Sequence, residues 1–183
     1  MGSDVVDNYS SRLGTTYQQR GVGFAYFELA GRFVSSMAGA EQMVNSVLAT
    51  EAGIPKAQRG WFADDRLASI HLREKVTKIV PIAERVLGSR HITTGFLRTT
   101  AFDLVNMRNH VAHGHFTDFE LDPASVTVRV GVYHQGYQLV TIPLRDLDED
   151  CDRAADLLSH AVCLWTTMPG STAEPMDFGD LDG

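Results

Sequence analysis

Apolar residues recur at helical spacing over most of this chain, and this periodicity constrains its fold more than any other feature. The helical stripes cover residues 24–51, 65–87, 94–114 and 146–165. One region alternates apolar with polar residues instead, which is typical of strands. There, residues 126–132 and 137–144 flank Gln135-Gly136 and indicate a β-hairpin. The pattern predicts a mainly α helical bundle with a β-hairpin before the last helix.

Two residues bear on where the helices end. Pro81 lies inside the second stripe, and we expect it to kink or split that helix because proline has no N–H to donate. Gly114 follows the third stripe at the position where glycine commonly ends a helix. The third helix is therefore expected to stop at Gly114.

Composition divides the chain into one folded part and two tails. Residues 1–20 are polar, and residues 169–183 are acidic and contain Pro and Gly, so we expect both segments to be flexible. The remaining residues, 21–168, are enough for a single domain with a substantial core. No run of about 18 apolar residues interrupts them, and residues 1–11 lack the features of a signal peptide. We expect a cytoplasmic protein without a membrane partner.

Charge is unevenly distributed along the chain. The whole sequence has a net charge of -7, which excludes a protein that coats nucleic acid indiscriminately. Residues 56–108, however, hold 10 basic and 5 acidic side chains, whereas residues 109–183 hold 3 basic and 13 acidic ones. The basic stretch either forms a surface for a polyanion or is a solvated helix face with i,i+4 ion pairs such as Glu74–Lys78.

The densest polar cluster of the sequence stands at residues 106–115, where the third helix is expected to end. On a helical wheel, Arg108 falls in the middle of the apolar arc that includes Leu104 and Val111. A buried arginine is costly unless an anion or carbonyl groups meet it. Arg108 is therefore either paired structurally or directed into a cleft where an anion binds.

Two neighbours give Arg108 a chemical context. Asn109 and His113 are four residues apart, close enough for the amide to orient the imidazole. The helix C-terminus favours a protonated imidazole, so His113 suits proton transfer near neutral pH. An arginine that stabilises phosphoryl oxygens beside a histidine that moves a proton can cleave a phosphodiester without metal or cofactor. We assign Arg108, Asn109 and His113 to catalysis, and His110, His115 and Arg98 to substrate binding.

The sequence Arg108-Asn109-His110-Val111-Ala112-His113-Gly114 resembles the motif of the HEPN superfamily, an Arg followed by a polar residue and then by His. The RNxxAHG form is similar to that of many small bacterial members, and the resemblance extends loosely over residues 21–168. It implies an all-α homodimer with two facing motifs and, in many members, a metal-independent RNase of toxin or defence systems. Gly114-His115 replace the Tyr that some toxin members carry two positions after the His.

We therefore expect an endoribonuclease in which His113 accepts the 2′-hydroxyl proton and a 2′,3′-cyclic phosphate is left. RNA, a second copy of the chain, and an antitoxin or regulatory protein are its expected partners. The alternative is a non-catalytic dimeric binding or regulatory module in which Arg108 and His113 form a buried structural pair.

Three further hypotheses concern other residues. His110, His113 and His115 could bind a metal ion, because imidazole suits zinc or nickel. Trp61-Phe62 could stack on a base beside Lys56 and Arg59, or fill the core instead. The acidic segment 174–182 could cover the basic cleft as a mimic of RNA.

Overall fold

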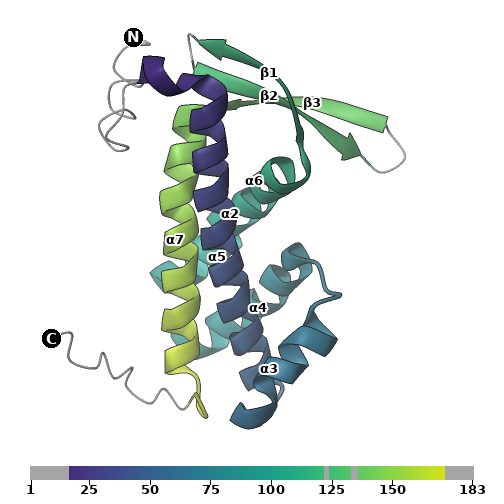
Figure 1. Cartoon of the computed structure of the whole chain (residues 1–183). Coiled ribbons are helices and arrows are strands. Elements are labelled where there is room, and N and C mark those ends of the chain that lie inside the picture. Colours follow the sequence, from purple (N-terminus) through teal and green to yellow (C-terminus); the bar gives the residue numbers. More distant parts are fainter. Residues whose placement is uncertain (1–16, 122–123, 133–135, 172–183) are drawn as a thin grey trace, which may run out of the picture.

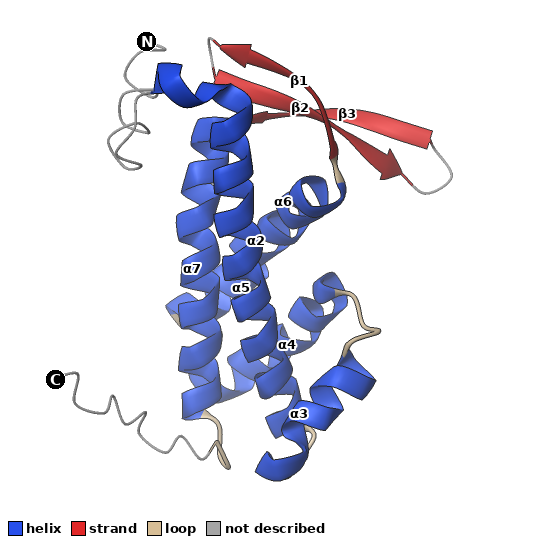
Figure 2. Cartoon of the chain, in the orientation of Figure 1, coloured by secondary structure: helices blue, strands red, loops and turns tan. Residues whose placement is uncertain are grey.

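The chain is mostly helical, with a small antiparallel sheet before the final helix, as the periodicity predicts (Figures 1 and 2). The computed structural model describes residues 17–121, 124–132 and 136–171. Most of the two predicted tails, and with them the acidic segment 174–182, lie outside these residues. The helices are α2 (Tyr17–Glu51), α3 (Arg59–Phe62), α4 (Leu72–Leu87), α5 (Ile92–Arg98), α6 (Thr100–His113) and α7 (Leu144–Thr167), with short turns η1 (Lys56–Gln58) and η2 (Ala63–Leu67). The strands are β1 (His115–Leu121), β2 (Ala124–Val132) and β3 (Gly136–Pro143).

Helices α2 and α7 lie side by side along the length of the molecule (Figure 1). Their contacts advance together along both helices: the Cys151 thiol points to the Leu29 carbonyl near one end, and the Trp165 indole N–H donates to the Thr50 hydroxyl near the other. The two helices are therefore parallel. This arrangement is possible because all the other elements of the domain connect them.

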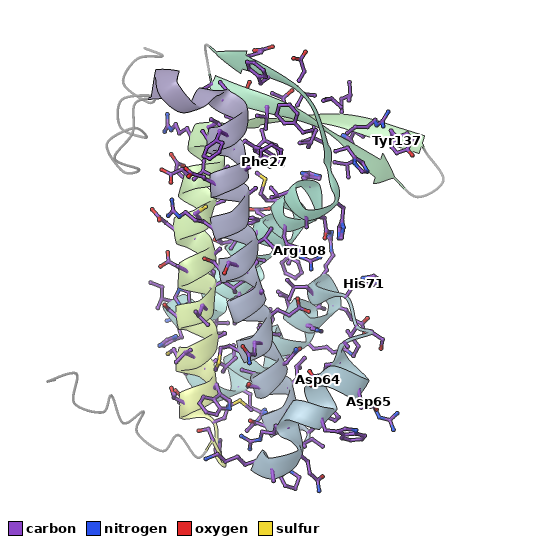
Figure 3. All side chains as sticks on the ribbon, viewed as in Figure 1. Phe27, Asp64, Asp65, His71, Arg108 and Tyr137 are labelled. Atoms are coloured by element: carbon purple, nitrogen blue, oxygen red, sulfur yellow. The ribbon has the colours of Figure 1, made fainter. Side chains whose placement is uncertain are left out.

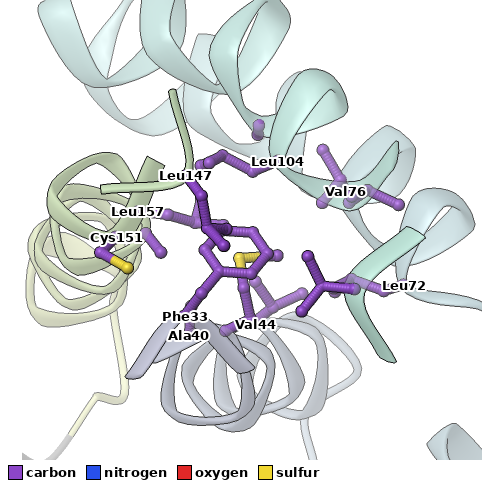
Figure 4. Close-up of a cluster of buried hydrophobic side chains, with 14 of the residues drawn as sticks. Phe33, Ala40, Val44, Leu72, Val76, Leu104, Leu147, Cys151 and Leu157 are labelled. Carbon is purple, nitrogen blue, oxygen red and sulfur yellow. The ribbon is translucent and has the colours of Figure 1, made fainter. Parts of the chain in front are cut away.

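The core lies where α2 and α7 meet α4 and α6. Phe33 of α2 is fully buried and packs in a cluster with Leu104 of α6, Leu147 of α7 and Val76 of α4 (Figure 4). Fully burying a side chain of this size stabilises the fold by roughly 1.5–3 kcal/mol. Helix α6 is thereby held against the central pair, which fixes the position of its C-terminal end.

The second predicted helix is shorter than expected and continues through its proline. Residues 65–71 belong to η2 and to the connection that follows, and α4 begins at Leu72. Pro81 lies inside α4, which continues to Leu87, so the helix does not split at Pro81. Pro81 is exposed. Water can therefore satisfy the carbonyl group that loses its helical partner.

The third predicted helix is divided at Thr99 into α5 and α6. Thr99 has φ -117° and ψ -78°, and its hydroxyl donates to the Gly95 carbonyl. Arg108 follows the buried Leu104 and Val105 by one turn, near the C-terminal end of α6, and is half-buried.

The sheet has three strands, in the order β1-β2-β3, where the sequence predicts only two. Strands β2 and β3 are the predicted hairpin. Strand β1 is less evident in the sequence because an irregularity between Phe116 and Asp118 interrupts its alternation. Val126, Val128 and Ile142 are buried on the inner face of the sheet.

Within the described residues, no helix has both the length and the apolar character that crossing a bilayer requires.

Candidate active site at the end of helix α6

The structure brings Arg108 and His113 together at the C-terminal end of α6. Guanidinium Nη1 of Arg108 lies 3.5 Å from Nε2 of His113. Arg108 is half-buried and His113 is exposed, so solvent reaches the pair. In Figure 3, Arg108 lies between the level of Tyr137 in the sheet and that of His71 at the start of α4. An arginine and a histidine are thus presented together at an open surface.

No carboxylate of the described residues neutralises the positive charge of Arg108. Among the described residues, its side chain has a hydrogen bond only to the His113 ring and no ion pair. Nε2 of His113 can accept this bond only when it carries no proton. The geometry therefore fits a neutral, acceptor imidazole beside an uncompensated cation, which is the state that a general base requires.

The other residues of the predicted cluster are placed differently. Asn109 is exposed, and the hydrogen bonds of the described residues include none between Asn109 and His113. The half-buried His110 contributes its carbonyl oxygen to the backbone bond with the Gly114 N–H, at 2.9 Å. His115 is exposed at the first position of β1, opposite Arg129 of β2. His110 and His115 are therefore near His113 in the chain, but no described contact joins either side chain to the pair.

Arg98 is engaged elsewhere. Its guanidinium forms an ion pair with the carboxylate of Glu84 in α4, and both side chains are partly exposed. Lys75 and Lys78 are likewise paired, with Glu41 at 2.6 Å and Glu74 at 3.0 Å. Much of the basic stretch thus has the ion-paired character of the alternative hypothesis, including the expected Glu74–Lys78 pair.

Two residues that the sequence analysis did not single out extend the site along α6. Arg73 of α4 donates to Oδ1 of Asn106 at 3.4 Å, and its guanidinium lies 5.8 Å from the ring centre of Phe102. Asn106 precedes His113 by two helical turns, on the same side of α6. No described carboxylate pairs with Arg73. Arg73 therefore adds a second uncompensated cation near the same helix, from a part of the chain 33 residues away.

Gly114 allows the sheet to approach the end of α6 closely. A Cβ atom at this position would lie 2.3 Å from the His110 carbonyl oxygen and 3.0 Å from Cβ and Cγ2 of Val128. Helix α6 ends at His113, as the glycine predicts, and Gly114 itself has φ -75° and ψ 140°, which is extended backbone. Glycine is required at this position because a side chain would not fit between the end of α6 and β2. It lets β2 pack against the helix end that carries His113.

The remaining hypotheses receive less support. Among the described residues, no three His, Cys, Asp or Glu side chains converge as metal ligands, so the three histidines near α6 do not form a metal site. Trp61 is exposed, so it does not fill the core. Base stacking there is also disfavoured, because Arg59 donates to the Ile54 and Gly170 carbonyls at 3.1 Å and the neighbouring Arg66 forms an ion pair with Asp65 at 3.1 Å. His160 contacts the Thr93 hydroxyl and the Phe96 ring, and burial lowers its pKa.

Fold and site together define a mainly helical protein with a small antiparallel sheet and an exposed Arg–His pair between them. Comparison with protein-family models, curated proteins and solved structures gives no match.

Proposed function

We propose that this protein is a metal-independent endoribonuclease of the HEPN type. The observation that supports the proposal is the pair formed by Arg108 Nη1 and His113 Nε2, 3.5 Å apart at an exposed helix end, where no carboxylate of the described residues pairs with the arginine. A cation and an imidazole at this separation can both reach one phosphodiester group.

In the proposed reaction, Nε2 of His113 accepts the proton of an RNA 2′-hydroxyl as the 2′-oxygen attacks the adjacent phosphorus. The bond from phosphorus to the 5′-oxygen breaks, and that oxygen takes a proton from water or from His115. Arg108 stabilises the negative charge that develops on the phosphoryl oxygens. The products are a 2′,3′-cyclic phosphate and a 5′-hydroxyl. Asn109 is exposed one residue from Arg108, and we assign it to orienting the substrate.

The proposal includes a homodimer and an antitoxin or other regulatory protein, in a toxin or defence system. An aromatic cluster of Phe27, Phe116 and Phe119 supports a protein partner, because all three rings are exposed. Ring centres are 5.8 Å apart for Phe27 and Phe116, and 6.5 Å apart for Phe116 and Phe119. Contiguous exposed apolar surface of this kind marks an interaction site.

Substitution of the pair tests the proposal. We expect Arg108→Ala and His113→Ala each to lower cleavage of a labelled single-stranded RNA in EDTA by about 100-fold or more, because each removes one of the two groups that act on the phosphodiester. Arg66→Ala is the matched control, since Arg66 is an exposed arginine on η2. Parental activity in either variant of the pair would contradict the assignment.

Stability measurements separate this proposal from the non-catalytic alternative. A buried structural pair would make Arg108→Ala destabilising by about 3–5 kcal/mol. His113 is exposed and Arg108 is half-buried, so we expect the free energy of unfolding to change by less than about 1 kcal/mol. Denaturant unfolding monitored by circular dichroism gives this value. A loss of several kcal/mol would favour the structural role.

A further inference from the structure

The outer face of the sheet carries a row of exposed side chains that begins beside the Arg108–His113 pair. His115 of β1 is opposite Arg129 of β2, and Arg129 is opposite Leu139 of β3. Residues directly opposite each other in an antiparallel sheet share a face, and so do residues two apart in one strand. Tyr137 therefore lies on the same face, diagonal to Arg129, and we include it in the row. Arg129 and His115 are exposed, and Tyr137 and Leu139 are 69% and 65% exposed.

Arg129 and Tyr137 form the chemical centre of this row. The guanidinium carbon of Arg129 lies 4.8 Å from the ring centre of Tyr137. Among the described residues, Arg129 has no ion pair with a carboxylate. The cation is held against one aromatic ring with its charge uncompensated, and the ring is largely open to solvent. An aromatic face beside an arginine is what proteins use to bind the bases and backbone of single-stranded nucleic acid.

The row begins close to the candidate active site in the chain. Only Gly114 separates His113 from His115, and neighbouring strands of a sheet are about 4.8 Å apart. Tyr137 is thus within reach of a short oligonucleotide whose phosphate lies at the Arg108–His113 pair.

Charged side chains are distributed unevenly along the outer face of the sheet, so one end of this face suits a polyanion better than the other. On β1, Asp118 and Glu120 are opposite Thr127 and Ser125, and both carboxylates are exposed. They lie along the strand beyond His115, away from the end of α6. The part of the outer face nearest the active site is therefore cationic and aromatic, and the far part is acidic.

We propose that the outer face formed by His115, Arg129, Tyr137 and Leu139 binds single-stranded RNA next to the cleaved bond. Tyr137 stacks on a base, and Arg129 contacts the backbone. This inference rests on the proposed function, because it takes its substrate from it. Stacking on an aromatic ring is possible for every base, so the surface contributes affinity with little sequence preference.

The chain contains a matched pair at the opposite end of the molecule. Trp61 of α3 is 59% exposed and lies beside Arg66. Arg66, however, forms an ion pair with Asp65 at 3.1 Å, so its charge is compensated. Helix α3 and the sheet occupy opposite ends of the fold (Figure 1). Trp61→Ala removes an exposed aromatic ring without touching the proposed surface.

Binding of a labelled single-stranded RNA of about ten nucleotides, protected by 2′-O-methyl groups, tests the inference by fluorescence anisotropy. We expect Tyr137→Ala to weaken binding about tenfold and Tyr137→Phe to preserve it, because the aromatic face carries the interaction. Arg129→Ala should weaken binding and reduce its salt dependence. Trp61→Ala should leave the affinity unchanged. Tyr137 is exposed, so its variants are expected to fold.

Equal affinity of the parent and Tyr137→Ala, no binding by the parent, or an equal loss in Trp61→Ala would overturn the inference. A change in molecular mass of Tyr137→Ala by analytical ultracentrifugation would also overturn it, because the face would then contact a second copy. Binding through Tyr137 by a parent that does not cleave RNA would contradict the proposed RNase alone. Cleavage that depends on Arg108, with binding independent of Tyr137, would contradict the RNA surface alone.

Discussion

At the scale of single residues, the geometry at the C-terminal end of α6 depends on a few side chains and one glycine. Arg108 and His113 lie on one helix, five positions apart, so their sequence spacing is sufficient to suggest that they act together. Arg73 could not be found in this way, because its contact with Asn106 depends on how α4 packs against α6. The role of Gly114 could not be predicted from the sequence either. A glycine after a helix predicts where the helix ends, whereas its actual requirement is the space beside Val128.

Adding a methyl group at Gly114 tests this requirement. We expect Gly114→Ala to lower the free energy of unfolding by about 1–3 kcal/mol, because its Cβ would overlap the His110 carbonyl and crowd Val128. Gly95→Ala is the matched control: nothing lies within 4 Å of its added Cβ, and Gly95 is inside α5, so this change should stabilise by about 0.5–1 kcal/mol. Urea unfolding measures both. A Gly114→Ala protein as stable as the parent would show that the sheet does not press on the helix end.

At the scale of elements, the sequence predicts which segments are helical better than where each helix begins and ends. Apolar periodicity identifies α2, α4, α6 and α7 because each buries one face against the core. It does not report the break at Thr99, and it overstates the effect of the exposed Pro81. Apolar periodicity also does not predict the contacts that join one element to another. Lys75 of α4 is 1% exposed and forms an ion pair with Glu41 of α2, although a lysine suggests a surface position.

The Lys75–Glu41 pair gives a prediction for the packing of α2 against α4. We expect Glu41→Gln to lower the free energy of unfolding by about 3–5 kcal/mol, because it leaves the buried Lys75 ammonium without its counter-ion. Lys75→Met should cost much less, since an apolar side chain then fills the buried site. Glu149→Gln is the surface control and should change stability by less than about 1 kcal/mol.

Thermal and urea unfolding of the three variants test this order. Equal destabilisation by Glu41→Gln and Glu149→Gln would contradict a buried ion pair between α2 and α4.

At the scale of the whole molecule, the charge of a surface depends on which side chains form ion pairs there rather than on the composition of the sequence. The basic stretch 56–108 points to a polyanion site, yet Lys75, Lys78 and Arg98 are neutralised by carboxylates. Conversely, Arg129 lies in the most acidic part of the sequence, and folding places its uncompensated charge on the sheet beside the end of α6. Sequence arithmetic cannot reveal such local surfaces, because it averages over residues that folding separates.

The most direct test of the central claim is the chemistry of the RNA end left by the purified protein in EDTA. We predict cleavage of single-stranded RNA that leaves a 2′,3′-cyclic phosphate, and no cleavage where the nucleotide on the 5′ side of the bond lacks its 2′-hydroxyl. Arg108→Ala protein, purified in parallel, should leave the RNA intact and so exclude a contaminating nuclease. Uncut RNA with the parent, or cleavage at the 2′-deoxy position, would contradict the account.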